Sequence, residues 1–234
     1  FQSTGVASEY FVVDASKVIP LPDSMTYDEG AMIEPLSVAV HAVRQAGDIK
    51  EKNITVIGAG PIGNLVSQVA YGLGANKVLI TDVSDWRLDK ARECGIKDTA
   101  NTLNTDFNTA LIETFGPDKA DIIYDCAGND NTINQAIRCA RKGSQIILVA
   151  VFEGMASVDL AVLNDHELNL NSTMMYRRED YEKAVSLAET KKVKLLPLIT
   201  NRFSFEKYQE AYEYIDNNKE HSMKVIINVG GVYS

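Results

Sequence analysis

The chain has 234 residues, of which 45% are hydrophobic and 24% are charged, which is typical of a globular protein with one large domain or one domain and part of another. Its formal net charge is −9, its pI is about 4.9 and it has no evident basic patch, which argues against nucleic acid or an anionic membrane as a partner. No apolar run is long enough to cross a bilayer and no signal peptide opens the chain, so we expect a cytoplasmic protein.

The first residues, "FQSTGVASEYFVVDASKVIPLP", include no initiator Met. They alternate like a strand, with Tyr10 and Val12 on one side and Phe11 and Val13 on the other, until "PLP" ends the pattern. We therefore expect a strand here, and a chain that is a fragment or whose front has been removed. The three cysteines, Cys94, Cys126 and Cys139, include no close metal-ligand pair, and we expect reduced thiols that serve mainly in packing.

Strand and helix signals alternate from residue 53 onward. Strands are predicted at 53–58, 77–82, 98–102, 120–128, 144–151 and 167–176, and helices at 61–73, 84–94, 105–116, 131–143 and 180–192. Ser84 and Thr105 are the expected N-caps of two of these helices, each closed by a glycine. Apolar strands separated by amphipathic helices predict a Rossmann-type α/β fold, a doubly wound six-stranded parallel sheet with order 3-2-1-4-5-6.

The two ends of the chain, residues 1–50 and 195–234, do not fit this alternation. The second end is predicted to form a helix over 201–218 and then a strand over 223–229. We assign both ends to a second, smaller structural unit.

A glycine-rich stretch, "IGAGPIGNLV" at 57–66, lies between the first predicted strand and helix. Gly58, Gly60 and Gly63 fit the pattern G-x-G-x-x-G, which is weak alone but here has the right flanking elements. Gly58 would permit the tight turn, Gly60 would let a pyrophosphate approach the backbone, and Gly63 would let helix and strand pack closely. The stretch predicts a dinucleotide-binding turn rather than a purely structural one.

The helix that follows begins with Pro61 and Ile62, which we count with the glycines among the cofactor-binding residues. Its free N–H groups and dipole favour phosphate, and Pro61 lacks only an N–H that would be unpaired anyway. Asp82 ends the second strand and would accept hydrogen bonds from the adenosine ribose while repelling a 2′-phosphate, which favours NAD over NADP. Arg87 could instead hold a 2′-phosphate, cover the adenine, or be a solvated helix residue.

Together with "VIGAGPIG" and "ITD", the stretch "EPLSVAVHA" at 34–42 resembles the medium-chain zinc-dependent dehydrogenases, nearest their polyol (sorbitol or iditol) branch. Other segments are similar to counterparts in that family, namely "GVASEYFVV", "VIPLPDSMTYDEGAMIEPLSVAVHA", "DIIYDCAGN" and "PLITNRFSFEKYQEAYEYI". The resemblance implies an NAD-binding Rossmann domain at 36–194, with 1–35 and 195–234 as parts of a β-rich, GroES-like catalytic domain that holds zinc.

The family's zinc ligands are only partly matched. The family supplies a Cys and a His-Glu pair from the front of the chain, but no Cys precedes Cys94 and "GHE" is absent. The resemblance leaves Glu34 as the catalytic and metal-binding residue, which in the polyol branch ligates zinc or binds its water. His41 lies among apolar neighbours, and a core histidine with one hydrogen bond is favoured over a metal ligand.

The resemblance also places further residues at the nicotinamide. Val149 and Ala150, at the end of the fifth strand, correspond to the backbone that meets the nicotinamide amide, and Cys126 and Ala127 lie near its ribose. Core packing is an equal alternative for Val149 and Cys126.

Substrate residues are expected after the sixth strand. The family's substrate-facing Arg-Tyr pair reads Met175-Tyr176 here, with Arg177 and Arg178 following. Tyr176 and Arg177 are therefore the candidate substrate residues. Two adjacent arginines could bind a phosphorylated or acidic sugar, or could belong to a solvated loop.

The resemblance implies NAD-dependent, zinc-dependent oxidation of a secondary alcohol of a polyol to the ketone, with this chain inactive alone. Alternatives are a threonine or simple alcohol dehydrogenase, a non-catalytic NAD-binding module, and a zinc-free quinone reductase that would prefer NADPH. The expected partners are a small-molecule polyol or alcohol and further copies of the chain, as a dimer or tetramer through "ELNLNSTMM".

Overall fold

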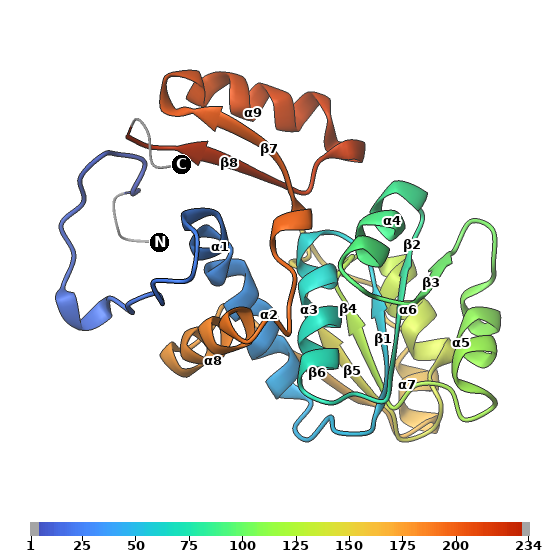
Figure 1. The fold of residues 1–234 in the computed structure, drawn as a ribbon. Coiled ribbons are helices and arrows are strands. Elements are labelled where there is room, and N and C mark those ends of the chain that lie inside the picture. Colours follow the sequence, from blue (N-terminus) through green and yellow to red (C-terminus); the bar gives the residue numbers. More distant parts are fainter. Residues whose placement is uncertain (1–4, 231–234) are drawn as a thin grey trace.

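The computed structural model describes residues 5–230, and its largest part is a parallel sheet of six strands in the order β3-β2-β1-β4-β5-β6 (Figure 1). The strands are β1 (Asn53–Ile57), β2 (Lys77–Asp82), β3 (Asp98–Asn101), β4 (Ile122–Asp125), β5 (Gln145–Leu148) and β6 (Asn169–Ser172). Every neighbouring pair is parallel. The predicted doubly wound fold and strand order are confirmed.

Helices cover both faces of this sheet. One face packs against α2 (Ile33–Gln45), α3 (Pro61–Gly72), α4 (Asp85–Glu93) and α8 (Arg178–Glu189), and the other against α5 (Phe107–Phe115), α6 (Asp130–Cys139) and α7 (Leu160–Asp165). The strands β1 and β4 are buried almost throughout, which explains why most of their residues are apolar. All four residues of the edge strand β6 are exposed.

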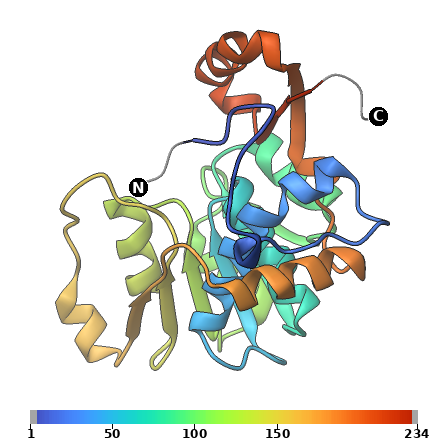
Figure 2. The same cartoon turned by 90° about the vertical axis from the view of Figure 1, so that its left-hand side faces the viewer.

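A second, smaller unit follows the sheet and lies above it in Figures 1 and 2. Here β7 (Ile199–Ser204) and β8 (Lys224–Asn228) pair in parallel, and α9 (Tyr208–Asn217) connects them. The prediction of a helix from residue 201 was therefore wrong at its start. Phe203 packs with Tyr214, their ring centroids 5.6 Å apart, so the alternating side chains of this stretch serve a strand packed on α9.

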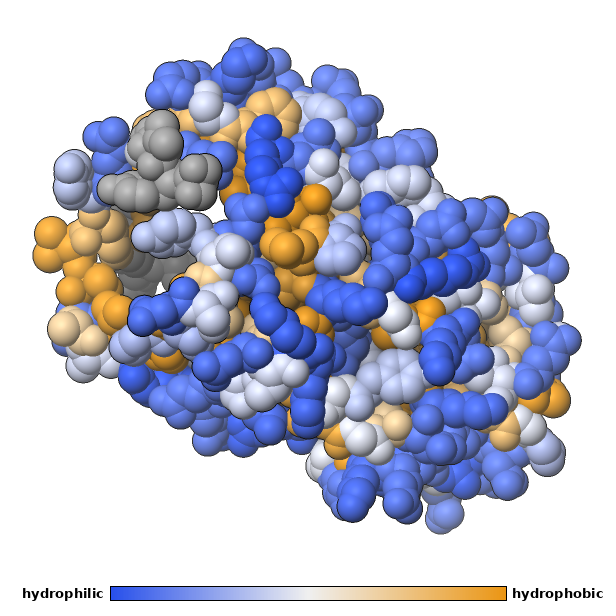
Figure 3. Space-filling view, viewed as in Figure 1, coloured by the Kyte–Doolittle hydropathy of each residue, from blue (hydrophilic) through white to orange (hydrophobic). Residues whose placement is uncertain are grey.

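The predicted N-terminal strand is also wrong. Within the described residues no strand includes 10–13, and Tyr10 is 90% exposed and Val12 96% exposed. A strand needs a neighbour for its backbone groups, and the alternating sequence has none in this part of the structure. Apolar residues gather on this segment at the left of Figure 3, whereas the face over α4 and α5 is mostly hydrophilic.

Smaller differences concern element ends and short helices. The N-cap of α5 is Asp106 rather than Thr105, because the Asp106 carboxylate accepts the N–H of Thr109 at 3.1 Å. The short helix α7 was not predicted. The remaining short elements are α1 (Tyr27–Ala31) and the 3₁₀ turns η1 (Ala15–Lys17), η2 (Leu196–Leu198), η3 (Phe205–Lys207) and η4 (Lys219–His221). Among residues 5–230, no helix combines the length and the apolar character that a membrane crossing requires.

Candidate functional site

The glycine-rich turn joins β1 to α3 at the carboxyl edge of the sheet. Gly58 has φ +96°, a conformation that L side chains rarely adopt. A Cβ on Gly63 would lie 1.8 Å from the carbonyl oxygen of Gly58, so only glycine allows α3 to approach β1 this closely. A Cβ on Gly60 would meet no described atom within 4 Å. The first and third glycines thus shape the turn, while the second leaves open space beside the backbone.

The N-terminus of α3 faces this open space. Gly60 is its N-cap and Pro61 its first residue, and no side chain of the described residues caps it by a hydrogen bond. The backbone N–H groups of the first turn and the positive end of the helix dipole are therefore free of side-chain competition for an anion. The residues fit a pyrophosphate, which needs close backbone approach and N–H donors.

Asp82 fastens the turn to the end of β2. It is 8% exposed, and its two carboxylate oxygens accept the N–H of Ala59 at 2.7 Å and of Ser84 at 2.9 Å. Each oxygen has a further lone pair, so Asp82 can still accept hydrogen bonds from a ribose hydroxyl.

Arg87 lies in α4, at the seam with the smaller unit. Its backbone N–H is capped by Ser84, and its Nη2 donates to the carbonyl oxygen of Lys219 in η4 at 3.2 Å. Next to it, Trp86 packs edge-on against His221 with ring centroids 5.5 Å apart. The described contacts of Arg87 therefore join two parts of the chain.

A cavity of about 270 Å³ lies beyond the ends of β4, β5 and β6. It brings together four of the residues predicted to bind cofactor: Ile62, Cys126, Val149 and Ala150. Its other lining residues are Val38, Val151, Thr173, Met174 and Met175. Burial, helped by the charge of Asp125, raises the pKa of the Cys126 thiol, so this residue contributes a neutral wall rather than a thiolate. The cavity suits a flat, mostly apolar group.

Asp125, which belongs to no recognised sequence motif, organises the turn after β4. Its buried side chain accepts the N–H groups of Ala127 and Gly128, both at 3.0 Å, and the hydroxyl of Thr132 at 3.1 Å. Its carbonyl oxygen accepts the N–H groups of Val149 and Ala150. Burial raises the pKa of Asp125 against the opposing effect of these hydrogen bonds. A carboxylate at the end of an apolar strand was the available sequence signal.

Glu34 lies close to Tyr176, which faces away from the smaller cavity. Glu34 is exposed in the first turn of α2. Burial raises the pKa of Tyr176, and the nearby charge of Glu34 adds to the effect. The Tyr176 ring packs edge-on against Tyr181, with centroids 4.9 Å apart. Tyr176 and Arg177 also line a second cavity, of about 680 Å³, between α8 and the N-terminal segment; the side chain of Arg177 is 73% exposed.

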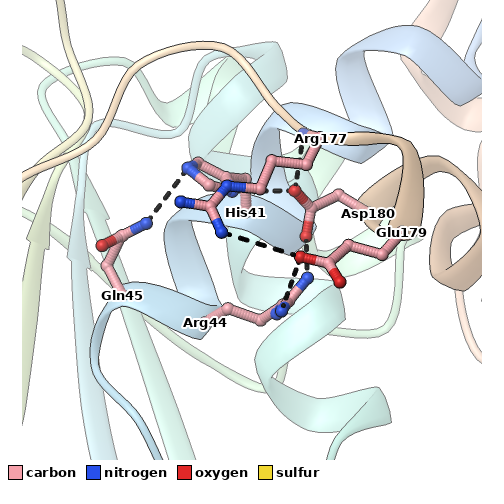
Figure 4. Close-up of polar contacts among 6 residues, drawn as sticks. All are labelled: His41, Arg44, Gln45, Arg177, Glu179 and Asp180. Carbon is pink, nitrogen blue, oxygen red and sulfur yellow. Dashed lines mark hydrogen bonds and ion pairs between the residues drawn. The ribbon is translucent and has the colours of Figure 1, made fainter.

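A buried aspartate, Asp180, joins α8 to α2 (Figure 4). Its carboxylate forms hydrogen bonds with Nδ1 of His41 at 2.8 Å and Nη1 of Arg44 at 2.6 Å. It also accepts a hydrogen bond from the backbone N–H of Arg177 at 2.8 Å. We call His41, Arg44 and Asp180 the α2–α8 polar cluster. His41 is a hydrogen-bonded histidine of the interior, as expected, although it also contacts Gln45 at 3.0 Å and so has two partners. The sequence offered no motif for Asp180.

The residues do not fit a zinc site on their own. Within 5–230 there is no group of three or more His, Cys, Asp or Glu side chains placed to hold a metal ion. Glu34 alone cannot supply the ligand set that zinc requires.

Comparison with known proteins places this chain among dehydrogenases, in agreement with its fold. The family model described as zinc-binding dehydrogenase matches residues 61–190, more than half of the chain. Sorbitol dehydrogenase 1 of Saccharomyces cerevisiae is 32% identical over 216 residues, covering 90% of this chain and 60% of its own length.

Two solved structures are similar over the same extent. L-idonate 5-dehydrogenase of Escherichia coli matches with a TM-score of 0.85 and 26% identity, over 93% of this chain and 62% of its own. Galactitol-1-phosphate dehydrogenase of Escherichia coli matches with a TM-score of 0.80 and 30% identity, over 88% of this chain and 62% of its own.

The fold is that of a Rossmann-type protein of the medium-chain dehydrogenase class. The chain belongs to the zinc-binding dehydrogenase family. It spans about three fifths of the length of the relatives it matches.

Proposed function

We propose that this chain is the NAD-binding part of a zinc-dependent dehydrogenase that oxidises a secondary alcohol of a polyol to the ketone. The observation that supports it best is the β1–α3 turn, where open space at Gly60 adjoins an uncapped helix N-terminus. The names of the relatives, which act on sorbitol, idonate and galactitol 1-phosphate, support a sugar alcohol or sugar acid as the substrate class.

In this proposal each described region has one task. The turn from Gly58 to Gly63 binds the pyrophosphate, and Asp82 binds the adenosine ribose. The cavity bounded by Cys126 and Val149 holds the nicotinamide and keeps water from its buried face. NAD, when bound, supplies the hydride acceptor.

Glu34 and Tyr176 form the substrate side of the proposal. Tyr176 is held against Tyr181 beside Glu34, so its hydroxyl is placed to hydrogen-bond a substrate hydroxyl. Arg177 is the cation available for an acidic or phosphorylated substrate. The proposal assigns Glu34 to a zinc ion whose other ligands the described residues do not provide. We also propose that the protein is cytoplasmic and that its copies associate with one another through the exposed strand β6.

The preference for NAD is tested by calorimetric titration of this chain with NADH and with NADPH. Because Asp82 repels a 2′-phosphate, we expect NADH to bind at least about tenfold more tightly. Asp82→Asn removes the negative charge and should reduce that preference at least about threefold. Asp85→Asn is the matched control, since it removes an exposed carboxylate in the first turn of α4 and should leave the preference unchanged. Equal or tighter binding of NADPH by the unaltered chain would instead favour the quinone reductase alternative.

A further inference from the structure

The segment 173–177, between β6 and α8, has a strained backbone. Met175 has φ +60°, in the left-handed region that a residue with a side chain adopts only at a cost. The same short segment serves two cavities: Thr173, Met174 and Met175 line the smaller one with Val149 and Cys126, whereas Tyr176 and Arg177 line the larger one. The turn at Met175 is what sends neighbouring side chains to opposite sides.

The strain requires contacts that hold the segment in place. At its far end, the N–H of Arg177 is bound by the carboxylate of Asp180, which is the third residue of α8. Tyr176 is held by its packing on Tyr181. Arg177 itself reaches Glu179 at 3.9 Å (Figure 4), so its side chain adds only a weak, exposed ion pair.

Asp180 can fix the segment because it is itself fixed from α2. Its two carboxylate oxygens form hydrogen bonds with His41 and Arg44, and its side chain is fully buried. His41 is oriented in turn by Gln45, one helical turn further along α2. With the Gln45 amide nitrogen donating to Nε2, the proton of His41 lies on Nδ1 and points to Asp180. The carboxylate therefore accepts three hydrogen bonds, two from α2 and one from the strained segment.

We propose that Asp180, held by His41 and Arg44, is a positioning residue that fixes segment 173–177 against the nicotinamide end of the cofactor cavity. The α2–α8 polar cluster thereby sets the distance between the helix that carries Glu34 and the segment that carries Tyr176. This inference rests on the proposed function for the identity of the cavity's ligand, and on the contacts of Asp180 alone for the placement of the segment.

The test uses Asp180→Asn, since an amide cannot accept from all three donors at once. Amide hydrogen exchange at Arg177 should become at least about tenfold faster, while exchange in β1 stays unchanged. The Kd for NADH should rise at least about threefold, whereas the Kd for ADP-ribose, which lacks the nicotinamide, should stay within about twofold. A purely structural role would weaken both ligands by the same factor.

Two further variants separate positioning from misfolding. Arg44→Met keeps the hydrogen bond from Arg177 to Asp180 and should give the same pattern with smaller changes. Arg138→Met is the matched control, because it breaks another ion pair, to Asp159 at 3.2 Å, away from the cluster. It should change neither the ratio of the Kd values for NADH and ADP-ribose nor the hydrogen exchange at Arg177. Unchanged exchange at Arg177 in both cluster variants, or equal weakening of NADH and ADP-ribose, would overturn the proposal. If the unaltered chain bound neither ligand, the proposed function would fail, and hydrogen exchange would still decide whether Asp180 holds the segment.

Discussion

Two turns follow the neighbouring central strands β1 and β4, and they are held in different ways. After β1, the path is set by missing side chains, because Gly58 has a left-handed backbone and Gly63 packs against its carbonyl oxygen. After β4, the path is set by a side chain, because the Asp125 carboxylate binds the N–H groups of Ala127 and Gly128. The turns also touch, since a Cβ on Gly58 would lie 3.2 Å from the nitrogen of Ala127.

The difference decides what each turn can do. Asp125 uses the backbone donors of its own turn, so that turn can shape a cavity wall but offers no cluster of free N–H groups. The glycine turn is stabilised without using the donors of the following helix, and these stay available for phosphate. In the dinucleotide binding that we propose, the glycine turn is the anion site and the Asp125 turn is a wall of the cavity.

The largest expected effect comes from filling the glycine turn at its closest contact. Gly63→Ala would place a methyl group 1.8 Å from a backbone oxygen, so α3 must move away from β1. We expect a loss of about 3 kcal/mol or more in the free energy of unfolding, which lowers Tm by roughly 6–12 °C for a chain of this size. Thermal unfolding followed by circular dichroism measures it. A Tm within about 2 °C of the unaltered chain would show that this contact does not shape the turn.

A smaller effect concerns the two buried aspartates, Asp125 and Asp180, whose contributions to stability should depend on pH with opposite signs. Burial raises the pKa of Asp125, so its contribution to stability is present below about pH 4 and is lost as pH rises through the folded pKa. Burial would also raise the pKa of Asp180, but its hydrogen bonds to Arg177, Arg44 and His41 outweigh burial and lower it. Its contribution is therefore present above about pH 4 and is lost on acidification.

The two asparagine variants should consequently diverge between about pH 2 and pH 7, with Asp180→Asn changing below about pH 4 and Asp125→Asn above it. Relative to the unaltered chain, Asp125→Asn should gain stability as pH rises and Asp180→Asn should lose it. Each kcal/mol of divergence corresponds to about 2–4 °C in Tm, which thermal scans across this pH range resolve. Parallel pH profiles for the two variants would contradict the opposite roles that we assign to these carboxylates.

The sheet could be predicted from the sequence because its signals are local. Strands such as Asn53–Ile57 are buried on both faces and mostly apolar, and amphipathic helices follow them, so the two hydrophobic periods alternate clearly along the chain. The glycine turn was predictable for the same reason. At residues 10–13 the alternation was equally clear, but no strand pairs there in the described part of the chain, and pairing is not written in the segment itself.

The candidate site was predictable where it is built from backbone and was missed where it is built from distant side chains. The glycine pattern pointed to Ile62, and the family resemblance pointed to Cys126, Val149 and Ala150. The structure brings all four to one cavity. Asp180 and His41 are 139 positions apart in the sequence, and only the packing of α8 on α2 brings them together. Short-range patterns carry no signal for such a contact.

The most direct test of the central claim is Gly60→Ala, titrated with NADH beside the unaltered chain. The added Cβ meets no described atom within 4 Å and the backbone of Gly60, at φ −65°, suits alanine, so Tm should stay within about 2 °C. Gly5→Ala, at another open glycine, is the matched control. If the turn holds the pyrophosphate, the methyl group occupies its place and the Kd for NADH should rise at least about tenfold. An unchanged Kd in a folded Gly60→Ala protein would contradict the dinucleotide-binding role of this turn.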